Sequence, residues 1–403
     1  MINQLQTTAG EGSSRDRSEG RTYHRGWVFG AACTGMLLFG MAFLSLGTIS
    51  TFIQSHFGLS AVEAASLASS LPFGMLAGSV IFGPVADRFG YKVLLAGATL
   101  VLLVSLEAIA FAPSLLALQL SFFGLGLGGG TLNGATNALA ADVTTDSKGA
   151  GLSLLGVFFG LGALGMPALI GWLTRIWDYR TIVASIGFFL VLPLVGFLLL
   201  RFPEPKQRQG FPLREGLVLL RHPLLLLLGA ILFFESGVEG MVSNWTTTFL
   251  GSRDIAVEKA LMALSLQIAA LVVTRLLLSR LLKRLPAARV LYFGLALIIT
   301  ASLILFYAHS FTVVAVAMVL FGAGFAAGFP VVLGFVAERY PTLSGTAFSI
   351  VIIMALIGNT LLNYFTGTLS QYAGIGYFPL LLAGSALTMV ILLRVVTRKM
   401  KQQ

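Results

Sequence analysis

Twelve long apolar runs divide this sequence, and they constrain its fold more than any other feature. Each run is close to the ~20 residues that an α-helix needs to cross ~30 Å of hydrocarbon. Only 10% of the residues are charged, whereas soluble domains carry about 25%. The sequence therefore predicts an all-α membrane protein with twelve transmembrane helices, near residues 27–53, 62–83, 92–112, 114–141, 150–172, 180–201, 223–249, 258–280, 288–308, 311–337, 344–370 and 376–396.

The lysines and arginines predict how these helices are oriented. With the N-terminus placed inside, 21 of them fall in inner segments and 4 in outer hairpins, while Arg275 lies within a span. Cytoplasmic loops carry the excess of positive charge, so both termini are expected in the cytoplasm of a multi-pass inner-membrane protein. The net charge of +10 is accordingly interpreted as topology, and no nucleic-acid partner is expected. The first apolar run is too long for a signal-peptide core and is predicted to be a retained helix.

The two halves of the sequence match each other at a constant offset of 196 residues. This shift pairs Gly126 with Gly322, Gly128 with Gly324, Asp142 with Glu338, Ser153 with Ser349 and Gly162 with Gly358. It predicts two six-helix pseudo-repeats, as in transporters that rock two halves around a site near the bilayer midplane. We expect a polar, disordered tail at 1–26, helical halves at 27–201 and 223–396, a cytoplasmic inter-half loop at 202–222 and a basic tail at 397–403.

The segment GPVADRFGYK at 83–92 joins the second and third spans and predicts a gate on the cytoplasmic side. Gly90 permits a tight turn. Asp87 can lie against a helix N-terminus, where free N–H groups favour an anion. Arg88 can reach Asp142, at the inner end of the fourth span. Contacts of this kind bias a conformational equilibrium, because an exposed ion pair is worth only ~0–1 kcal/mol.

This segment resembles the signature loop of the major facilitator superfamily. The resemblance rests on Gly83, Asp87, Arg88, Gly90 and Lys92, with Val93 in place of the loop's last basic residue. Together with the twelve spans and the repeat it covers nearly the whole chain, and it implies the fold of that family and a latch that holds the outward-open state. The repeat predicts a second pair of Arg284 with Glu338. Because Lys283 falls at the position of Asp87, we expect the stronger latch in the N-terminal half.

Two glutamates, Glu235 and Glu239, lie deep in the seventh span within FFESGVEGMVSNW (233–245). A charged acid at the bilayer centre costs roughly 2.5–3.5 kcal/mol, and residues four apart share one helix face. Two close acids in a dry setting resist ionising together, which is typical of a proton-coupling site. The alternative is structural: Arg275 of the eighth span forms an ion pair with Glu235. We therefore expect Glu239 to be the functional acid, with Glu235 either a second coupling residue or the partner of Arg275.

Amide side chains at similar depths indicate a binding cavity. Amides pair with hydroxyl groups and an indole offers a flat apolar surface, so the set suits a neutral polyol such as a sugar. The alternative is that buried amides join helices to one another. The candidate substrate-binding residues are Asn133, Asn137, Asn244, Trp245, Gln267, Asn359 and Asn363.

A narrower resemblance concerns the fourth and seventh spans. The stretches TLNGATN (131–137) and EGMVSNW (239–245) resemble helices of the fucose/galactose-type sugar–proton symporters and related sugar-like facilitators. In those relatives an acid often stands where Asn133 stands here. The departure moves the expected coupling role to Glu239 and Glu235, or removes coupling altogether.

These features predict a secondary transporter that takes up a sugar or a similar small polar solute with protons. The alternative is a proton-driven efflux antiporter for drugs or metabolites, because GLGALGMPALIG (160–171) loosely resembles a glycine–proline pattern of exporters. The sequence shows no phosphate-binding loop, metal-ligand cluster or nucleophile arrangement, so no enzyme activity, cofactor or metal is expected. The expected partners are the solute, protons and the lipid bilayer, and the chain is expected to be monomeric.

Overall fold

A computed structural model of the chain describes residues 23–207 and 218–402. Within these residues, twelve helical segments are long and apolar enough to cross a membrane, which confirms the predicted all-α architecture. Most of the predicted tail at 1–26, and residues 208–217 of the predicted inter-half loop, lie outside the described residues.

The first half of the chain contains six spans. They are α1 (Arg25–Phe57), α2 (Ala61–Phe89), α3 (Tyr91–Ala110), α4 (Leu115–Val143), α5 (Lys148–Leu173) and a sixth span divided into α6 (Tyr179–Phe189) and α7 (Val191–Leu199). Serines cap several of these helices. At the start of α2, for example, the Glu63 carboxylate accepts hydrogen bonds from the backbone N–H and hydroxyl of Ser60, which lower the pKa of this exposed acid.

The second half repeats this arrangement with one change. Its spans are α9 (Pro223–Gly251), α10 (Val257–Leu281), α11 (Ala287–Phe306), a tenth span divided into α12 (Phe311–Phe325) and α13 (Gly328–Arg339), α14 (Ser344–Ala373) and α15 (Phe378–Gln402), with short 3₁₀ turns at Pro341–Leu343 and Ile375–Tyr377. The tenth span breaks at 326–327, beside Gly324 and Gly328. Because α15 continues through Gln402, residues 397–402 belong to the last helix rather than to a separate tail.

Close helix contacts at glycine follow the 196-residue offset. A Cβ on Gly126 would collide with the carbonyl oxygen of Leu71, and a Cβ on Gly322 would collide with that of Gln267. The offset of 196 relates Gly126 to Gly322 and also Leu71 to Gln267. The contacts of Gly162 with Leu37 and of Gly358 with Phe233 are related in the same way. The repeat therefore fixes the same backbone approaches in both halves, where a side chain would hold the helices apart.

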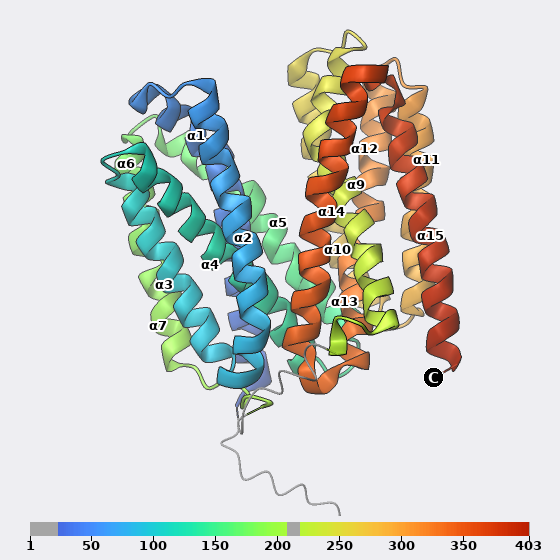
Figure 1. Cartoon of the computed structure of the whole chain (residues 1–403), viewed down its shortest axis with the longest axis horizontal. Helices are drawn as coiled ribbons and strands as arrows, with labels where there is room; N and C mark the ends of the chain where they lie inside the picture. Colours follow the sequence, from blue (N-terminus) through green and yellow to red (C-terminus); the bar gives the residue numbers. More distant parts are fainter. Residues whose placement is uncertain (1–22, 208–217, 403) are drawn as a thin grey trace, which may run out of the picture.

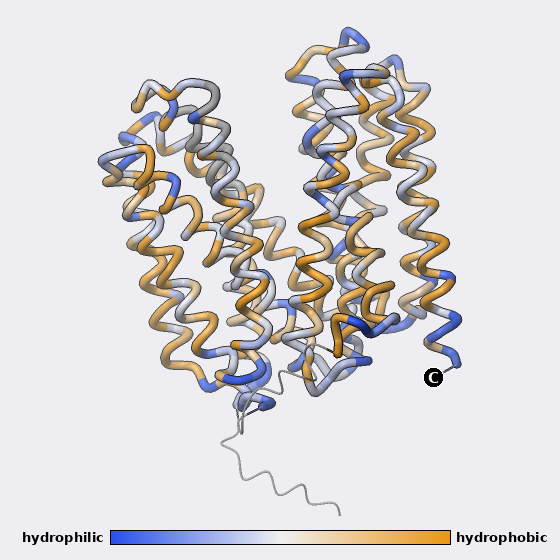
Figure 2. Tube along the Cα trace, in the orientation of Figure 1, coloured by the Kyte–Doolittle hydropathy of each residue, from blue (hydrophilic) through white to orange (hydrophobic). Residues whose placement is uncertain are grey.

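The two halves meet at one end of the molecule and diverge at the other (Figure 1). We call the end where they meet, which is also the end where α15 finishes, the terminal end. Here α2 packs against α14, and α5 packs against α10 and α13. Along the helices most residues are hydrophobic, and hydrophilic residues are most frequent at the two ends (Figure 2). The arrangement is that of two helical bodies joined at one side of a membrane.

Candidate functional site

A network of amide hydrogen bonds joins α9 to α14 within the second half. Oδ1 of Asn363 accepts hydrogen bonds from Nδ2 of Asn244 at 3.0 Å and from the indole Nε1 of Trp245 at 3.1 Å. The amide of Asn363 donates to the backbone oxygen of Asn359 at 2.8 Å, and Nδ2 of Asn359 donates to the carbonyl of Ser236 at 3.1 Å. Four of the predicted binding residues are thus brought together, and Asn244 remains exposed.

The other predicted amides lie apart from this network. In α4, Nδ2 of Asn137 donates to the backbone oxygen and Oδ1 of Asn133, so these two bond to each other. Gln267 on α10 is 2% exposed, and its side-chain oxygen has no hydrogen-bond partner. Among the described residues, the predicted amide side chains therefore form two separate clusters, one in each half, and Gln267 belongs to neither.

Glu235 and Glu239 occupy different surroundings on α9. Glu235 is 1% exposed, and neither of its carboxylate oxygens has a hydrogen-bond partner. Its carboxylate lies against Gly328, the first residue of α13, where a Cβ would collide with it. Glu239 is half-buried. The more buried acid thus lies at the break in the tenth span, and the less buried one lies a turn further along α9, toward the amide network.

Arg275 lies between the two halves rather than in the predicted ion pair with Glu235. Its Nη1 donates to the carbonyl oxygen of Gly156 on α5 at 3.3 Å, and its Nε has no partner. The described residues contain no ion pair between Arg275 and Glu235, so that prediction is wrong for this conformation. In the part of the chain that the structure describes, no hydrogen bond or ion pair joins the three groups, but both glutamates are near enough for their charges to act on the guanidinium.

The carboxylate of Asp87 joins the halves at the terminal end. It accepts hydrogen bonds from the backbone N–H groups of Gly345 and Thr346, at 3.2 and 2.9 Å, and from the Thr346 hydroxyl at 2.7 Å. These N–H groups lie in the first turn of α14, where the helix leaves donors free and favours a negative charge. The expected contact of Asp87 with a helix N-terminus is therefore made across the two halves.

Asp142 has partners other than the predicted Arg88. Nζ of Lys206, on the segment that joins the two halves, lies 2.8 Å from Asp142 and also donates to the Ser344 hydroxyl at 2.6 Å. The hydroxyl of Tyr91 donates to the same carboxylate. Arg88 is exposed and lies over the ring of Phe89. The predicted Arg88 pair is therefore wrong, and the inter-half segment supplies the cation.

The second predicted pair is also replaced by another cation. Arg284 is exposed, while Glu338 has the nearby charge of Lys148 at the start of α5. Nζ of Lys148 donates to the backbone oxygen of Ala337 at 2.9 Å, which joins the halves again. Lys283, at the repeat position of Asp87, forms only an exposed contact of 4.0 Å with Asp146.

The remaining residues of the signature loop include two glycines that shape the backbone, Gly83 and Gly90, and an exposed lysine, Lys92. A Cβ on Gly83 would lie 2.7 Å from the backbone oxygen of Gly345, so the glycine permits close approach of α2 and α14. Gly90 has a φ of 84°, in the region that favours glycine, and directly precedes the first residue of α3. Lys92 is exposed.

Two serines of the repeat, Ser153 and Ser349, make inter-half contacts that the sequence analysis did not predict. The Ser153 hydroxyl donates to the backbone oxygen of Arg275 at 2.8 Å, and the Ser349 hydroxyl donates to that of Ser79. Both donors and both acceptors are related by the offset of 196. The repeat register contained this signal, since the pair Ser153 and Ser349 was visible in it. Lys206 lies outside the repeat, so nothing in that register indicated it.

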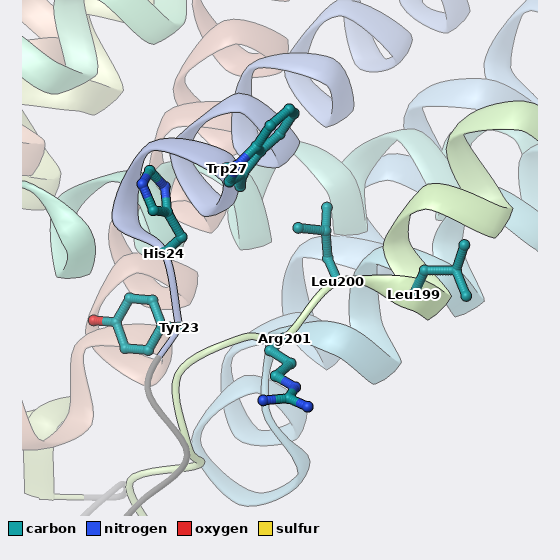
Figure 3. A pocket seen from close by; sticks show the side chains of 6 residues that line it. All are labelled: Tyr23, His24, Trp27, Leu199, Leu200 and Arg201. Carbon is teal, nitrogen blue, oxygen red and sulfur yellow. The ribbon is translucent and has the colours of Figure 1, made fainter.

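A cavity of about 400 Å³ lies elsewhere, where α1 begins and α7 ends. It is lined by Tyr23, His24, Trp27, Leu199, Leu200 and Arg201 (Figure 3). None of the predicted binding residues lines it. Its side chains point in several directions rather than toward one point, so it is not the candidate binding site.

Comparison with known proteins identifies the class that this fold and its inter-half contacts define. The family model described as Major Facilitator Superfamily matches residues 31–361 and 262–403. The chain therefore belongs to the major facilitator superfamily, as the signature loop indicated. It is a multi-pass integral membrane transporter rather than an enzyme.

Curated relatives match part of the chain. The niacin transporter NiaP of Acinetobacter baylyi is 34% identical over 148 residues, which cover 36% of this chain and 31% of that protein. The multi-drug resistance efflux pump PmrA of Streptococcus pneumoniae is 26% identical over 152 residues, 37% of this chain and 38% of the pump. The chain thus aligns with less than two fifths of the length of either relative.

Among solved structures, the chain is similar to FucP, the fucose:proton symporter of E. coli. The structure of FucP in the outward conformation matches with a TM-score of 0.78 and 17% identity, covering 91% of this chain and 98% of FucP. This likeness establishes the fold over nearly the whole chain.

Proposed function

We propose that this protein is a proton-coupled secondary transporter that takes up a small polar solute, a sugar, across the inner membrane by alternating access. The observation that carries the proposal is the network of Asn244, Trp245 and Asn363, which places two amides and an indole together on α9 and α14. Amides bond to sugar hydroxyls, and an indole ring packs against the C–H face of a pyranose. A small number of polar groups fixed on a rigid wall is typical of a small-molecule site.

Glu239 is the proposed coupling acid. It lies on the same helix as Asn244 and Trp245 and is half-buried, so water and protons can reach it. Glu235 is enclosed and has no hydrogen-bond partner for either oxygen, which favours its neutral, protonated form. The pair can therefore hold one proton at a depth where two full charges would be costly.

The orientation follows from the distribution of positive charge. If the terminal end faces the cytoplasm, as the positive-inside rule predicts, the halves are closed toward the cytoplasm and diverge toward the outside. The hydrogen bonds of Asp87 and Lys206 then stabilise the outward-facing conformation. We further propose that the transporter acts as a monomer, because each half supplies its own amide group and one chain supplies both halves.

The second candidate function is proton-driven efflux of drugs or metabolites. It is favoured by the similarity to the efflux pump PmrA, which covers 37% of this chain. An efflux site for cations would use exposed acids and aromatic rings, whereas the described network on α9 and α14 consists mainly of amides. This contrast favours the sugar proposal.

A ligand screen on the purified protein tests the proposal directly. Ligands that bind the folded state raise its melting temperature. We expect Tm to rise with D-xylose, L-fucose or another monosaccharide, and not with ethidium or niacin. The sugar that raises Tm is then added outside proteoliposomes, where an inward proton gradient should drive its accumulation in the lumen. A rise in Tm with ethidium alone, followed by proton-driven ethidium export, would establish the efflux function instead.

A further inference from the structure

We propose that Arg275 is the residue that links protonation of Glu239 and Glu235 to the contact between the two halves. The inference rests on the proposed proton coupling and adds a route by which it acts. Arg275 belongs to α10 in the second half, and its guanidinium bonds to a carbonyl of α5 in the first half. The two acids that act on it belong to the second half.

The pseudo-repeat shows that the arginine side chain is not needed to join the halves. At the α2–α14 contact, the Ser349 hydroxyl donates to the backbone oxygen of Ser79. At the related α5–α10 contact, the Ser153 hydroxyl donates to the backbone oxygen of Arg275. The same hydrogen bond from a serine hydroxyl to a backbone oxygen is made at both places, yet the residue that supplies the oxygen is a serine in one and an arginine in the other. The guanidinium is therefore an addition to a contact that forms without it.

The guanidinium of Arg275 has few bonds of its own and lies near both the carbonyl of Gly156 and the two glutamates of α9. It is 6% exposed, its Nε has no hydrogen-bond partner, and its bond to Gly156 is long at 3.3 Å. A buried cation with so few partners is costly unless an opposite charge is near. Glu239 and Glu235 are the acids close enough to act on it.

No other titratable group in the packed helices competes for this role. Beyond Lys148 at its first position, α5 carries no titratable side chain, and α12 carries none. On α9 the two glutamates are the only acids. The charged residues of α10 other than Arg275, and those of α13, lie at helix ends: they are Glu258, Lys259, Arg280, Glu338 and Arg339.

The direction of the effect follows from which partners share a half. Arg275 can pair with Glu239 or Glu235 in any conformation, because α9 and α10 belong to one half. It can bond to Gly156 only when the halves touch at the terminal end. When the acids carry charge they draw the guanidinium away from Gly156, and when they are protonated they release it. Protonation therefore favours the conformation with the terminal end closed, since only a difference in interaction between two states shifts their populations.

Gly156 provides a second way to perturb the link without removing any charge. A Cβ on Gly156 would lie 2.8 Å from Nη1 and 3.1 Å from Cζ of Arg275, so an alanine there displaces the guanidinium. A Cβ on Gly165 of the same helix would meet nothing within 4 Å, so this glycine is a matched control.

Distance measurements between spin labels test the proposal without any substrate. One pair, at Thr145 and Leu285, reports on the terminal end, and a second pair, at Phe111 and Tyr372, reports on the opposite end. All four side chains are exposed, and Cys33→Ser removes the native cysteine. In the parent protein, a change from mildly alkaline to mildly acidic pH should raise the closed-to-open ratio at the terminal end by roughly fivefold. In Arg275→Gln this pH response should be lost.

The variants separate failure of this proposal from failure of proton coupling. A parent protein with no pH response would overturn both. A pH response that persists unchanged in Arg275→Gln would leave coupling in place and overturn the role of Arg275. Should Arg275→Gln not fold, Gly156→Ala decides: it should shift the ratio severalfold toward the open terminal end at every pH, while Gly165→Ala should match the parent. Equal ratios in the two alanine variants would overturn the proposal.

Discussion

Lys206 and Asp142 form a salt bridge of 2.8 Å between the inter-half segment and the end of α4, and Lys206 also bonds to Ser344 at the start of α14. One ammonium group thus contacts both halves. The offset of 196 relates Ser344 to Lys148 and Asp142 to Glu338. At the related contact between α5 and α13, the cation is therefore Lys148, which belongs to α5 itself. At the contact of Asp142 with Ser344, the residue related to Lys148 is the hydroxyl-bearing Ser344, and the cation is Lys206 of the inter-half segment.

Replacing Lys206 should loosen the terminal end. Because the pair is partly exposed, Lys206→Gln should cost about 0.5–1 kcal/mol of the closed state, or roughly two- to fivefold in the closed-to-open ratio. The Thr145–Leu285 distance distribution measures this ratio. Arg201→Gln, a change of the same charge at an exposed position of the same segment, is the control. Equal ratios in both variants would show that Lys206 does not hold the halves together.

Replacing Asp87 should have a larger effect than replacing Lys206. Asp87 is 1% exposed and accepts three hydrogen bonds across the halves, and bonds to a charged group are worth roughly 1.5–3 kcal/mol. Asp87→Asn should therefore shift the protein toward the open terminal end, as measured by the same distance. Asp178→Asn is the matched control, because Asp178 caps α6 within one half. If the closed-to-open ratio in Asp87→Asn equals that of the parent protein, Asp87 does not hold the two halves together at the terminal end.

Most of the fold could be predicted from the sequence because the membrane restricts the possibilities. A span must be long, apolar and helical, so twelve apolar runs predict twelve spans. The offset of 196 predicts the pseudo-repeat, since glycines such as Gly126 and Gly322 hold the same close approaches in both halves. The break in the tenth span was not predicted. Its glycines suit close packing and a helix break equally well.

The candidate site was less predictable, because sequence spacing does not say which cation reaches which acid. Asp87 could be placed at a helix N-terminus from charge alone. Arg88 was expected to pair with Asp142, yet it points to the exposed surface and Lys206 takes the place. Depth along the helices suggested Arg275 as the partner of Glu235, but depth does not give the direction of a side chain, and Arg275 turns toward α5.

The indole N–H of Trp245 offers a test of the proposed binding network. Trp245→Phe keeps an aromatic ring but loses the hydrogen bond to Asn363, which leaves Oδ1 of Asn363 with one donor, Asn244, instead of two. We expect sugar affinity to fall by about fivefold, which corresponds to roughly 1 kcal/mol. Isothermal titration with the sugar found in the screen measures this change. Trp172→Phe, at an exposed tryptophan on α5, should bind like the parent, and a similar loss in both variants would argue against a binding role for Trp245.

The related glycines Gly126 and Gly322 should be equally intolerant of alanine. In each case the new methyl group would meet the backbone of the neighbouring helix, where no flexible side chain can yield. Gly126→Ala and Gly322→Ala should each lose about 1–3 kcal/mol of stability. Gly97→Ala and Gly384→Ala meet nothing within 4 Å and should gain up to about 1 kcal/mol from helix propensity. Thermal denaturation in one detergent ranks the four variants, and a tolerated alanine at Gly126 would contradict the packing.

Glu239 is the position where loss of charge should separate binding from accumulation. Glu239→Gln keeps the size and hydrogen-bonding ability of the side chain but cannot release a proton. We expect accumulation driven by a pH gradient to disappear, while exchange of labelled for unlabelled sugar across proteoliposomes continues. Glu258→Gln, an exposed acid at the start of α10, should leave both activities at the level of the parent. Full accumulation in Glu239→Gln would exclude this residue as the coupling acid, and Glu235→Gln would then be measured in the same assay. In that variant, loss of accumulation with exchange retained would assign coupling to the enclosed acid at the break of the tenth span.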